Sequence, residues 1–172
     1  SGGSALDVYG GYAKSNDIEH NTVEISSGTA RSVYGGESDG TGKAKDNTAK
    51  LTGGTLTGDI FGGSAKNGDA VENIVNIEGG STSNHDAYGG FSTNGNATGN
   101  TVNITGGSVR NVDGGRSASG NATGNIVNIG SADAAFGGSI TGIINGGSGT
   151  TYGKDYRTGN TLNVYGNVAA PN

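Results

Sequence analysis

The chain has 172 residues and a formal net charge of −5, with 37 Gly, one Pro and no Cys, Met or Trp. Leu, Ile, Val and Phe together number only 29, so any hydrophobic core must be small. The absence of Cys excludes disulfides and thiolate chemistry, and ten dispersed Lys and Arg residues form no basic face for nucleic acid. No apolar run approaches the roughly 20 residues that span a bilayer. We therefore expect no nucleic-acid partner and no membrane contact by this segment, and the missing Met suggests an internal fragment.

Two short motifs alternate along the chain. The first is an apolar residue, an aromatic residue and two glycines, at 8–11, 33–36, 60–63, 87–90, 112–115 (with Asp113 in the aromatic place) and 135–138. The second is Asn-x-apolar-x-apolar, and it begins at Asn21, Asn47, Asn73, Asn100, Asn125 and Asn160. The aromatic positions are 25, 27, 27, 25 and 23 residues apart, and the asparagines 26, 26, 27, 25 and 35. Such a fixed period indicates a repeat architecture.

Each repeat contains short stretches of alternating apolar and polar residues, bounded by Gly, Asn, Ser and Asp, and none has a helical period. In 100–104, alternation places Asn100, Val102 and Ile104 on one face and Thr101 and Asn103 on the other. A unit of about 26 residues with two to four core side chains cannot fold alone, but stacked copies share one core. The sequence thus predicts an all-β fold, a single parallel β-solenoid over 1–172, with about six coils of about 26 residues.

The sixth repeat is longer than the others. From the aromatic position to the Asn, the first five repeats count 12 or 13 residues, whereas Phe136 and Asn160 lie 24 apart. We therefore expect an insertion or excursion at 139–159, either a looped-out segment or half of an additional turn.

The Val-Tyr-Gly-Gly motifs and the segment Gly-Asn-Ala-Thr-Gly-Asn-Thr-Val-Asn-Ile-Thr-Gly-Gly at 95–107, nearly repeated at 120–129, resemble the repeats of autotransporter passenger domains. These are bacterial surface proteins, and the resemblance covers nearly the whole chain. It implies a right-handed, single-stranded parallel β-helix in an extracellular, adhesin-like stalk at the bacterial cell surface or in a secreted protein.

The Asn that opens the second motif recurs in all six repeats, with the same parity as the buried Val and Ile. This pattern predicts an Asn ladder, in which stacked amides bond from coil to coil and satisfy turn backbone. The alternative is a row of amides that faces a ligand.

A row of rings is the candidate binding stripe: Tyr9, Tyr34, Phe61, Tyr88 and Phe136. Asp113 interrupts this row, whereas the preceding position is always Val, Ile or Ala, so we expect the apolar row to face inward and the rings outward. An exposed stripe could stack on host glycans or on a surface protein. The alternative is that the rings stack on one another and shield a corner.

No constellation for catalysis or for a resident metal emerges. Asp7, Asp59 and Asp86 precede aromatic positions, but the calcium-binding nonapeptide pattern is absent, so they are expected to cap turns. The acids are dispersed, and His20 and His85 fall in different registers, so a polysaccharide-acting enzyme is the weakest hypothesis. No cofactor is expected.

The sequence favours a non-enzymatic extracellular structural or adhesive module, with many weak contacts along its length. Neither end carries a recognisable cap, and unpaired terminal strands are templates for another strand. End-to-end association into a filament is therefore the chief alternative.

Overall fold

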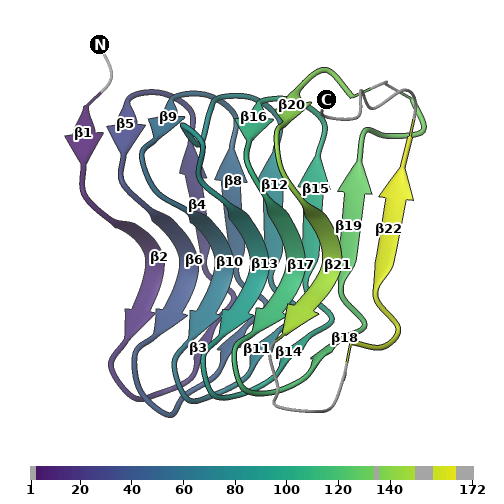
Figure 1. Cartoon of the computed structure of the whole chain (residues 1–172). Helices are drawn as coiled ribbons and strands as arrows, with labels where there is room; N and C mark the ends of the chain where they lie inside the picture. Colours follow the sequence, from purple (N-terminus) through teal and green to yellow (C-terminus); the bar gives the residue numbers. More distant parts are fainter. Residues whose placement is uncertain (1–2, 134–135, 150–156, 166–172) are drawn as a thin grey trace.

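A computed structural model describes residues 3–133, 136–149 and 157–165. The chain forms a right-handed parallel β-solenoid of about five turns, and the described residues include no helix (Figure 1). This confirms the predicted all-β solenoid with a spacing of about 26 residues between coils, with about five turns where about six coils were expected.

Two six-stranded sheets form the main walls, and every strand pair in them is parallel. Sheet 1 contains β2 (Val8–Ala13), β6 (Val33–Ser38), β10 (Ile60–Ala65), β13 (Ala87–Ser92), β17 (Val112–Ser117) and β21 (Ile144–Gly149). Sheet 2 contains β4 (Thr22–Ile25), β8 (Thr48–Leu51), β12 (Ile74–Ile77), β15 (Thr101–Ile104), β19 (Ile126–Ile129) and β22 (Thr161–Val164).

Two-residue strands join these walls. Sheet 3 lies between sheets 1 and 2 in each coil and contains β3 (Ile18–Glu19), β7 (Ala44–Lys45), β11 (Ala70–Val71), β14 (Ala97–Thr98) and β18 (Ala122–Thr123). Strands β1 (Ser4–Ala5), β5 (Thr29–Ala30) and β9 (Thr55–Leu56) continue through bridges at Ser81 to β16 (Ser108–Val109) and β20 (Ser139–Ile140). From β2 to β19, each described coil therefore repeats the same sequence of long and short strands, with an isolated bridge at Ser81 in place of one short strand.

The core is a column of aliphatic side chains between sheets 1 and 2. In β15, Val102 and Ile104 are fully buried and Asn103 is half-buried, as the alternation predicts. The position before the aromatic row, occupied by Ile60 in β10 and Val112 in β17, is also fully buried. Each coil thus contributes a few aliphatic residues to one continuous core.

The paired glycines allow sheet 1 to approach sheet 2. A Cβ on Gly36 would lie 2.5 Å from Asn47 Cγ, and a Cβ on Gly35 would lie 2.8 Å from the backbone carbon of Thr48. The strands of sheet 1 curve at mid-length, where these pairs lie (Figure 1). Positive φ belongs to other glycines, such as Gly54 and Gly80 in the turns after sheet 2. The pairs are therefore required for close backbone approach.

The sixth coil differs from the sequence-based assignment. Asn145, and not Phe136, pairs with Asp113 in the register of sheet 1, and Phe136 packs against the end of the core instead. Nine residues separate β19 from β20, whereas three separate β15 from β16. Strands β20 and β21 lie inside the range 139–159 that was expected to be inserted, and residues 150–156 of that range lie outside the described residues.

Candidate binding groove on sheet 1

An internal row of asparagines lies just before the strands of sheet 2, one in each coil. Asn100 Nδ2 donates to Asn125 Oδ1 at 3.0 Å and to Ala70 O at 2.9 Å, and its own Oδ1 accepts from Asn73 N and Nδ2, both at 3.0 Å. The same pattern of amide bonds continues through every coil, at Asn21, Asn47, Asn73, Asn100, Asn125 and Asn160.

Four members of this Asn ladder, Asn47 to Asn125, are fully buried. Buried amides must be hydrogen-bonded, and here each one bonds both its neighbour in the next coil and a backbone carbonyl of sheet 3. These amides face the interior and cannot face a ligand. The Asn row therefore holds adjacent coils together.

The first four rings of the aromatic row form one continuous stack. Tyr9, Tyr34, Phe61 and Tyr88 lie with successive centroids 4.8 to 5.1 Å apart and successive planes 7 to 13° apart. Burial raises the pKa of Tyr34 to about 12. The rings point away from the aliphatic core, as expected, but each inner ring has both faces covered by its neighbours.

The expectation of an exposed stripe is wrong at Phe61 and Tyr88, and the alternative of rings that stack on one another describes the first four rings. Tyr9, at the end of the stack, is 38% exposed, but Phe61 is 9% and Tyr88 6% exposed. Both faces of Phe61 are covered by neighbouring rings, and Tyr88 stacks on Phe61 with the Arg116 guanidinium 5.7 Å from its ring centroid, so neither ring is an open platform for a sugar ring. Phe136, the fifth predicted member, lies outside the row altogether.

A second outer row lies three positions further along each strand of sheet 1: Tyr12, Glu37, Ser64, Phe91, Arg116 and Ser148. The bend at the glycine pair turns this row toward the aromatic row. Tyr12 meets the edge of Tyr9 with centroids 5.5 Å apart, and Phe91 meets Phe61 at 5.9 Å and Tyr88 at 5.8 Å. We use the name sheet 1 groove for the outer face that carries these two rows, and a hollow of about 250 Å³ lies in it beside Glu37 and Phe91.

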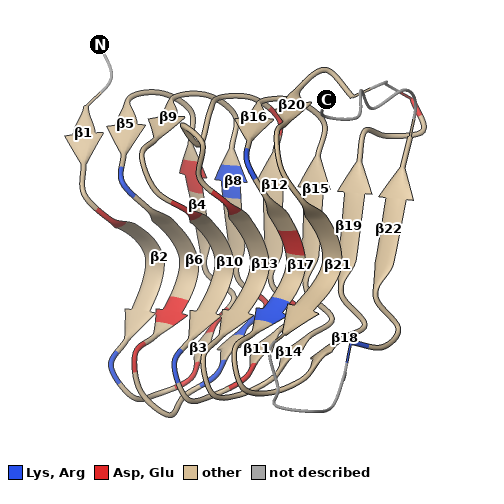
Figure 2. Ribbon diagram, viewed as in Figure 1, with Lys and Arg blue, Asp and Glu red and all other residues tan. Residues whose placement is uncertain are grey.

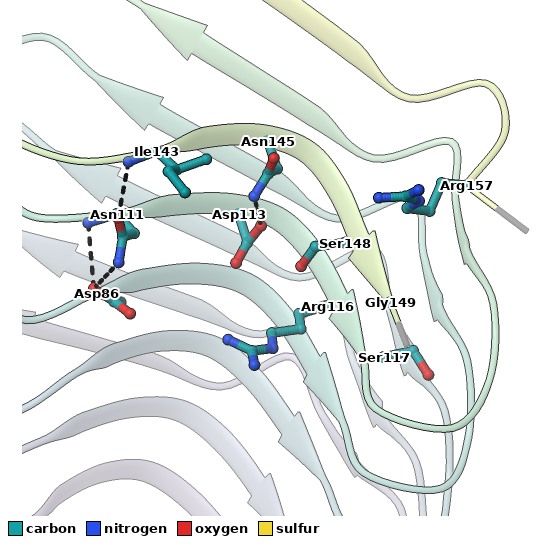
Figure 3. Close-up of a pocket in the computed structure, with 10 residues that line it drawn as sticks. All are labelled: Asp86, Asn111, Asp113, Arg116, Ser117, Ile143, Asn145, Ser148, Gly149 and Arg157. Carbon is teal, nitrogen blue, oxygen red and sulfur yellow. Dashed lines mark hydrogen bonds between the residues drawn. The ribbon is translucent and has the colours of Figure 1, made fainter. Parts of the chain in front are cut away.

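Where the ring stack ends, the sheet 1 groove becomes polar. A hollow of about 310 Å³, which we call the polar pocket, is lined by Asp86, Asn111, Asp113, Arg116, Ser117, Ile143, Asn145, Ser148, Gly149 and Arg157 (Figure 3). Asp113 and Arg116 come from β17, and Asn145 and Ser148 come from β21 in the next coil. The polar pocket thus spans two coils.

Asp86 forms one wall of the polar pocket and is fully engaged. Arg110 donates from Nε to Oδ1 at 2.8 Å and from Nη2 to Oδ2 at 3.1 Å, Asn111 donates from N and Nδ2, and the Tyr88 hydroxyl donates at 3.1 Å. Burial alone would raise the pKa of Asp86, but the bonds from Arg110 and Asn111 more than offset it and lower the pKa. Asp86 is therefore an ionised structural carboxylate.

Asp113 is a different kind of carboxylate. It is only 5% exposed, and within normal geometry only Asn145 Nδ2 donates to it among the described residues, at 2.8 Å from Oδ1. Burial raises the pKa of Asp113, while Asn145, Ser148 and Arg116 partly oppose that rise. Arg116 is exposed, and its Nη1 donates to Tyr88 Oη at 3.2 Å.

The side chains two positions before the aromatic row also link neighbouring coils. Asp59 Oδ1 accepts from Asp86 N at 2.9 Å, Asp86 Oδ1 accepts from Asn111 N at 3.2 Å, and Asn111 Oδ1 accepts from Ile143 N at 2.8 Å. These side chains cap the next coil, not their own turn as the sequence suggested. Within 3–133, 136–149 and 157–165, no group of three His, Asp or Glu residues is placed to hold a metal ion.

Charged residues gather mainly in turns and pair with one another (Figure 2). Around sheet 3, Lys43 lies 3.8 Å from Asp69, and Lys45 lies 3.2 Å from Asp46. His20 and His85 lie near Asp46 and Asp59, in separate turns. The described surface therefore mixes both signs of charge around the coils.

No family model, curated protein or solved structure matches the chain. In the described part of the chain, no helix is long and apolar enough to cross a membrane. The coils, their parallel register and their ladders define a β-helix repeat protein.

Proposed function

We propose that the chain is a non-enzymatic structural and adhesive module of an extracellular bacterial surface protein, of the kind that autotransporter passenger domains represent. The sheet 1 groove is its binding face. The observation that carries this proposal is that two outer rows with aromatic rings run side by side across successive coils of sheet 1, whereas the amides of the outer row of sheet 2 at Asn76, Asn103 and Asn128 bond to one another.

The geometry of the groove suits an extended partner. Successive coils offer contacts about 4.8 Å apart, so a polymer laid along the solenoid axis meets several coils at once. Linked weak contacts of this kind give avidity without any single strong site. A host glycan or an extended segment of a surface protein has the required length.

Binding assays on host cells and on a glycan array test the proposal. The Tyr12→Ser/Phe91→Ser double variant alters the second outer row and leaves the ring stack in place. A matched control, Lys50→Ser/Asn76→Ser, alters the outer face of sheet 2. We expect the first variant to lose binding and the control to keep it. Equal binding by both variants would exclude the sheet 1 groove as the adhesive face.

A filament subunit is the second candidate function. It is favoured by the unpaired hydrogen-bonding groups at the two ends of the Asn ladder. Among the described residues, nothing donates to Asn21 Oδ1, and the backbone N–H of Asn160 has no partner. Leu6 near the first coil is 75% exposed, and Val164 in the last strand is also exposed. A second copy stacked head to tail would join Asn160 of one copy to Asn21 of the next.

Light scattering over a range of concentrations, followed by electron microscopy, tests this second function. Head-to-tail stacking predicts rods whose length grows with concentration and whose growth is reduced by Asn21→Ala. A strictly monomeric protein at high concentration would exclude the filament.

A further inference from the structure

The polar pocket lies where the ring stack gives way to other residues. Position 113 follows Tyr88 in the register of sheet 1, and Asn145 follows Asp113. In the second row, Arg116 follows Phe91 and Ser148 follows Arg116. Four polar side chains thus replace rings and small residues over two coils, at the place where a hollow of about 310 Å³ opens.

Three of these side chains, Asp113, Arg116 and Ser148, retain hydrogen-bonding capacity. Ser148 Oγ is buried and has no hydrogen-bond partner within normal geometry, although a weak hydrogen bond from it helps to lower the pKa of Asp113. Buried polar atoms without partners are rare and call for an explanation. Arg116 lines the hollow, donates from Nη1 to Tyr88 Oη and forms no ion pair within 4 Å among the described residues, so its guanidinium retains donors for a ligand.

The unused groups specify the chemistry of a ligand. Asp113 accepts hydrogen bonds, Arg116 only donates them, and Ser148 does both. A free anion would be repelled by Asp113, and a free cation would be repelled by Arg116. A hydroxyl group both donates and accepts without charge, so two adjacent hydroxyls can bond Asp113 and Arg116 together.

The rim of the polar pocket adds an apolar contact. Ile143 is 66% exposed and borders the hollow on the side of Asn111 (Figure 3). Sugar rings combine vicinal hydroxyls with C–H faces, which pack on apolar side chains. Ligand sites commonly combine apolar walls with a few convergent polar groups in this way.

We propose that the polar pocket binds one neutral sugar residue through a pair of vicinal hydroxyls held between Asp113 and Arg116, with Ser148 as a third contact. This inference rests on the proposed adhesive function, because it names glycans as the class of partner for the sheet 1 groove. The pocket binds a single residue of the glycan, and the rest of the chain of sugars extends along the groove.

Titration of the full chain with free neutral sugars, followed by NMR chemical shifts, tests the inference. The panel contains glucose, galactose, mannose, fucose and N-acetylglucosamine, together with inorganic phosphate and ammonium as charged probes. We expect saturable, millimolar binding of at least one sugar, with shifts at β17 and β21 and none from the charged probes. Arg116→Ala should weaken this binding about tenfold or more, since hydrogen bonds from charged groups are strong.

Two further variants make the outcome decisive. Ser148→Ala should weaken sugar binding without loss of stability, because that hydroxyl has no partner to lose. Arg31→Ala, which removes an exposed guanidinium near the other end of sheet 1, should bind like the wild type. The inference is overturned if no neutral sugar saturates, if only a charged probe binds, or if Arg116→Ala binds normally. Adhesion that depends on Tyr12 and Phe91 but persists in Arg116→Ala would overturn the sugar pocket and leave the adhesive function standing.

Discussion

Replacing Asn100 by Ala is the most informative perturbation of the solenoid. The change removes two hydrogen bonds that the amide donates, to Ala70 O and Asn125 Oδ1, and two that it accepts from Asn73. Asn125 Oδ1 keeps the bond from the backbone of residue 100. Three buried groups lose their partner: Ala70 O, Asn73 N and one hydrogen of Asn73 Nδ2. At about 1 to 1.5 kcal/mol for each, the total cost is about 3 to 4.5 kcal/mol.

Asn103 provides the matched comparison two residues away. It is half-buried on the outer face of β15, where it donates to Asn76 Oδ1 at 2.8 Å and accepts from Asn128 Nδ2 at 2.7 Å. Water can replace both bonds there, so Asn103→Ala should cost about 0 to 1 kcal/mol. Asn21→Ala, at the half-buried end of the Asn ladder, should fall between the two because its Oδ1 has no partner to lose.

Urea denaturation followed by circular dichroism measures the order of these variants. The midpoints should fall in the order Asn103→Ala, Asn21→Ala, Asn100→Ala, from highest to lowest. If Asn100→Ala is too unstable to fold, the difference between Asn21→Ala and Asn103→Ala still tests the reasoning. Equal midpoints for the ladder and outer-face variants would refute the assignment of the ladder as the main coil-to-coil connection.

Three other changes have defined outcomes in the same assay. Gly36→Ala should cost about 1 to 3 kcal/mol because its Cβ would lie 2.5 Å from Asn47 Cγ, whereas Gly3→Ala meets nothing within 4 Å and should be neutral. Phe61→Leu should cost about 1 to 3 kcal/mol by removing two ring stacks, and Phe61→Tyr should restore most of it; similar losses for both would contradict a role for stacking. Burial raises the pKa of Asp113, so this side chain stabilises the fold in its protonated form. That contribution is lost as the pH rises from the ordinary Asp pKa through the raised pKa. Asp113→Asn should therefore gain stability relative to the wild type as the pH rises above the ordinary Asp pKa, and a stability difference that does not change with pH would refute the buried charge.

The coil architecture could be predicted because its determinants are strictly periodic. Alternation in 100–104 places Asn100, Val102 and Ile104 inside, and all three are fully buried. The Asn row has no substitution in six repeats, and only a residue with both donor and acceptor in its side chain can continue such a ladder. Register in a stacked array follows from the repeat itself, so no long-range information was needed.

The sheet 1 groove could not be predicted in the same way. Alternation predicts that the rings lie outside. It does not predict the bend at the glycine pair, which turns Tyr12 and Phe91 toward the rings of the aromatic row. The rings are covered by one another and by this second row, a consequence of curvature that no local pattern records. Alternation likewise places Asn103 on the outer face but does not show that it belongs to an outer Asn ladder.

The misassignment of Phe136 has a specific cause. Phe136-Gly137-Gly138 matches the motif by residue type, and Ile144-Asn145-Gly146-Gly147 does not, because Asn replaces the ring. The signal that distinguishes them is the distance from the second glycine to the Asn it packs against. This distance is 10 or 11 residues in the first five coils, 13 from Gly147 to Asn160 and 22 from Gly138 to Asn160.

A repeat that is identical in every coil can build a wall but not a discrete site, because each position has the same neighbours on both sides. A site needs a break in a ladder, and Asp113 is such a break in the ring row. The buried carboxylate retains one coil-to-coil bond, from Asn145 at 2.8 Å, so adjacent strands stay in register while its charge remains incompletely compensated. A Tyr or Phe at position 113 would continue the stack at lower electrostatic cost. The raised pKa of Asp113 and the unpartnered Ser148 hydroxyl are therefore located where a solenoid that only supported itself would have placed another ring.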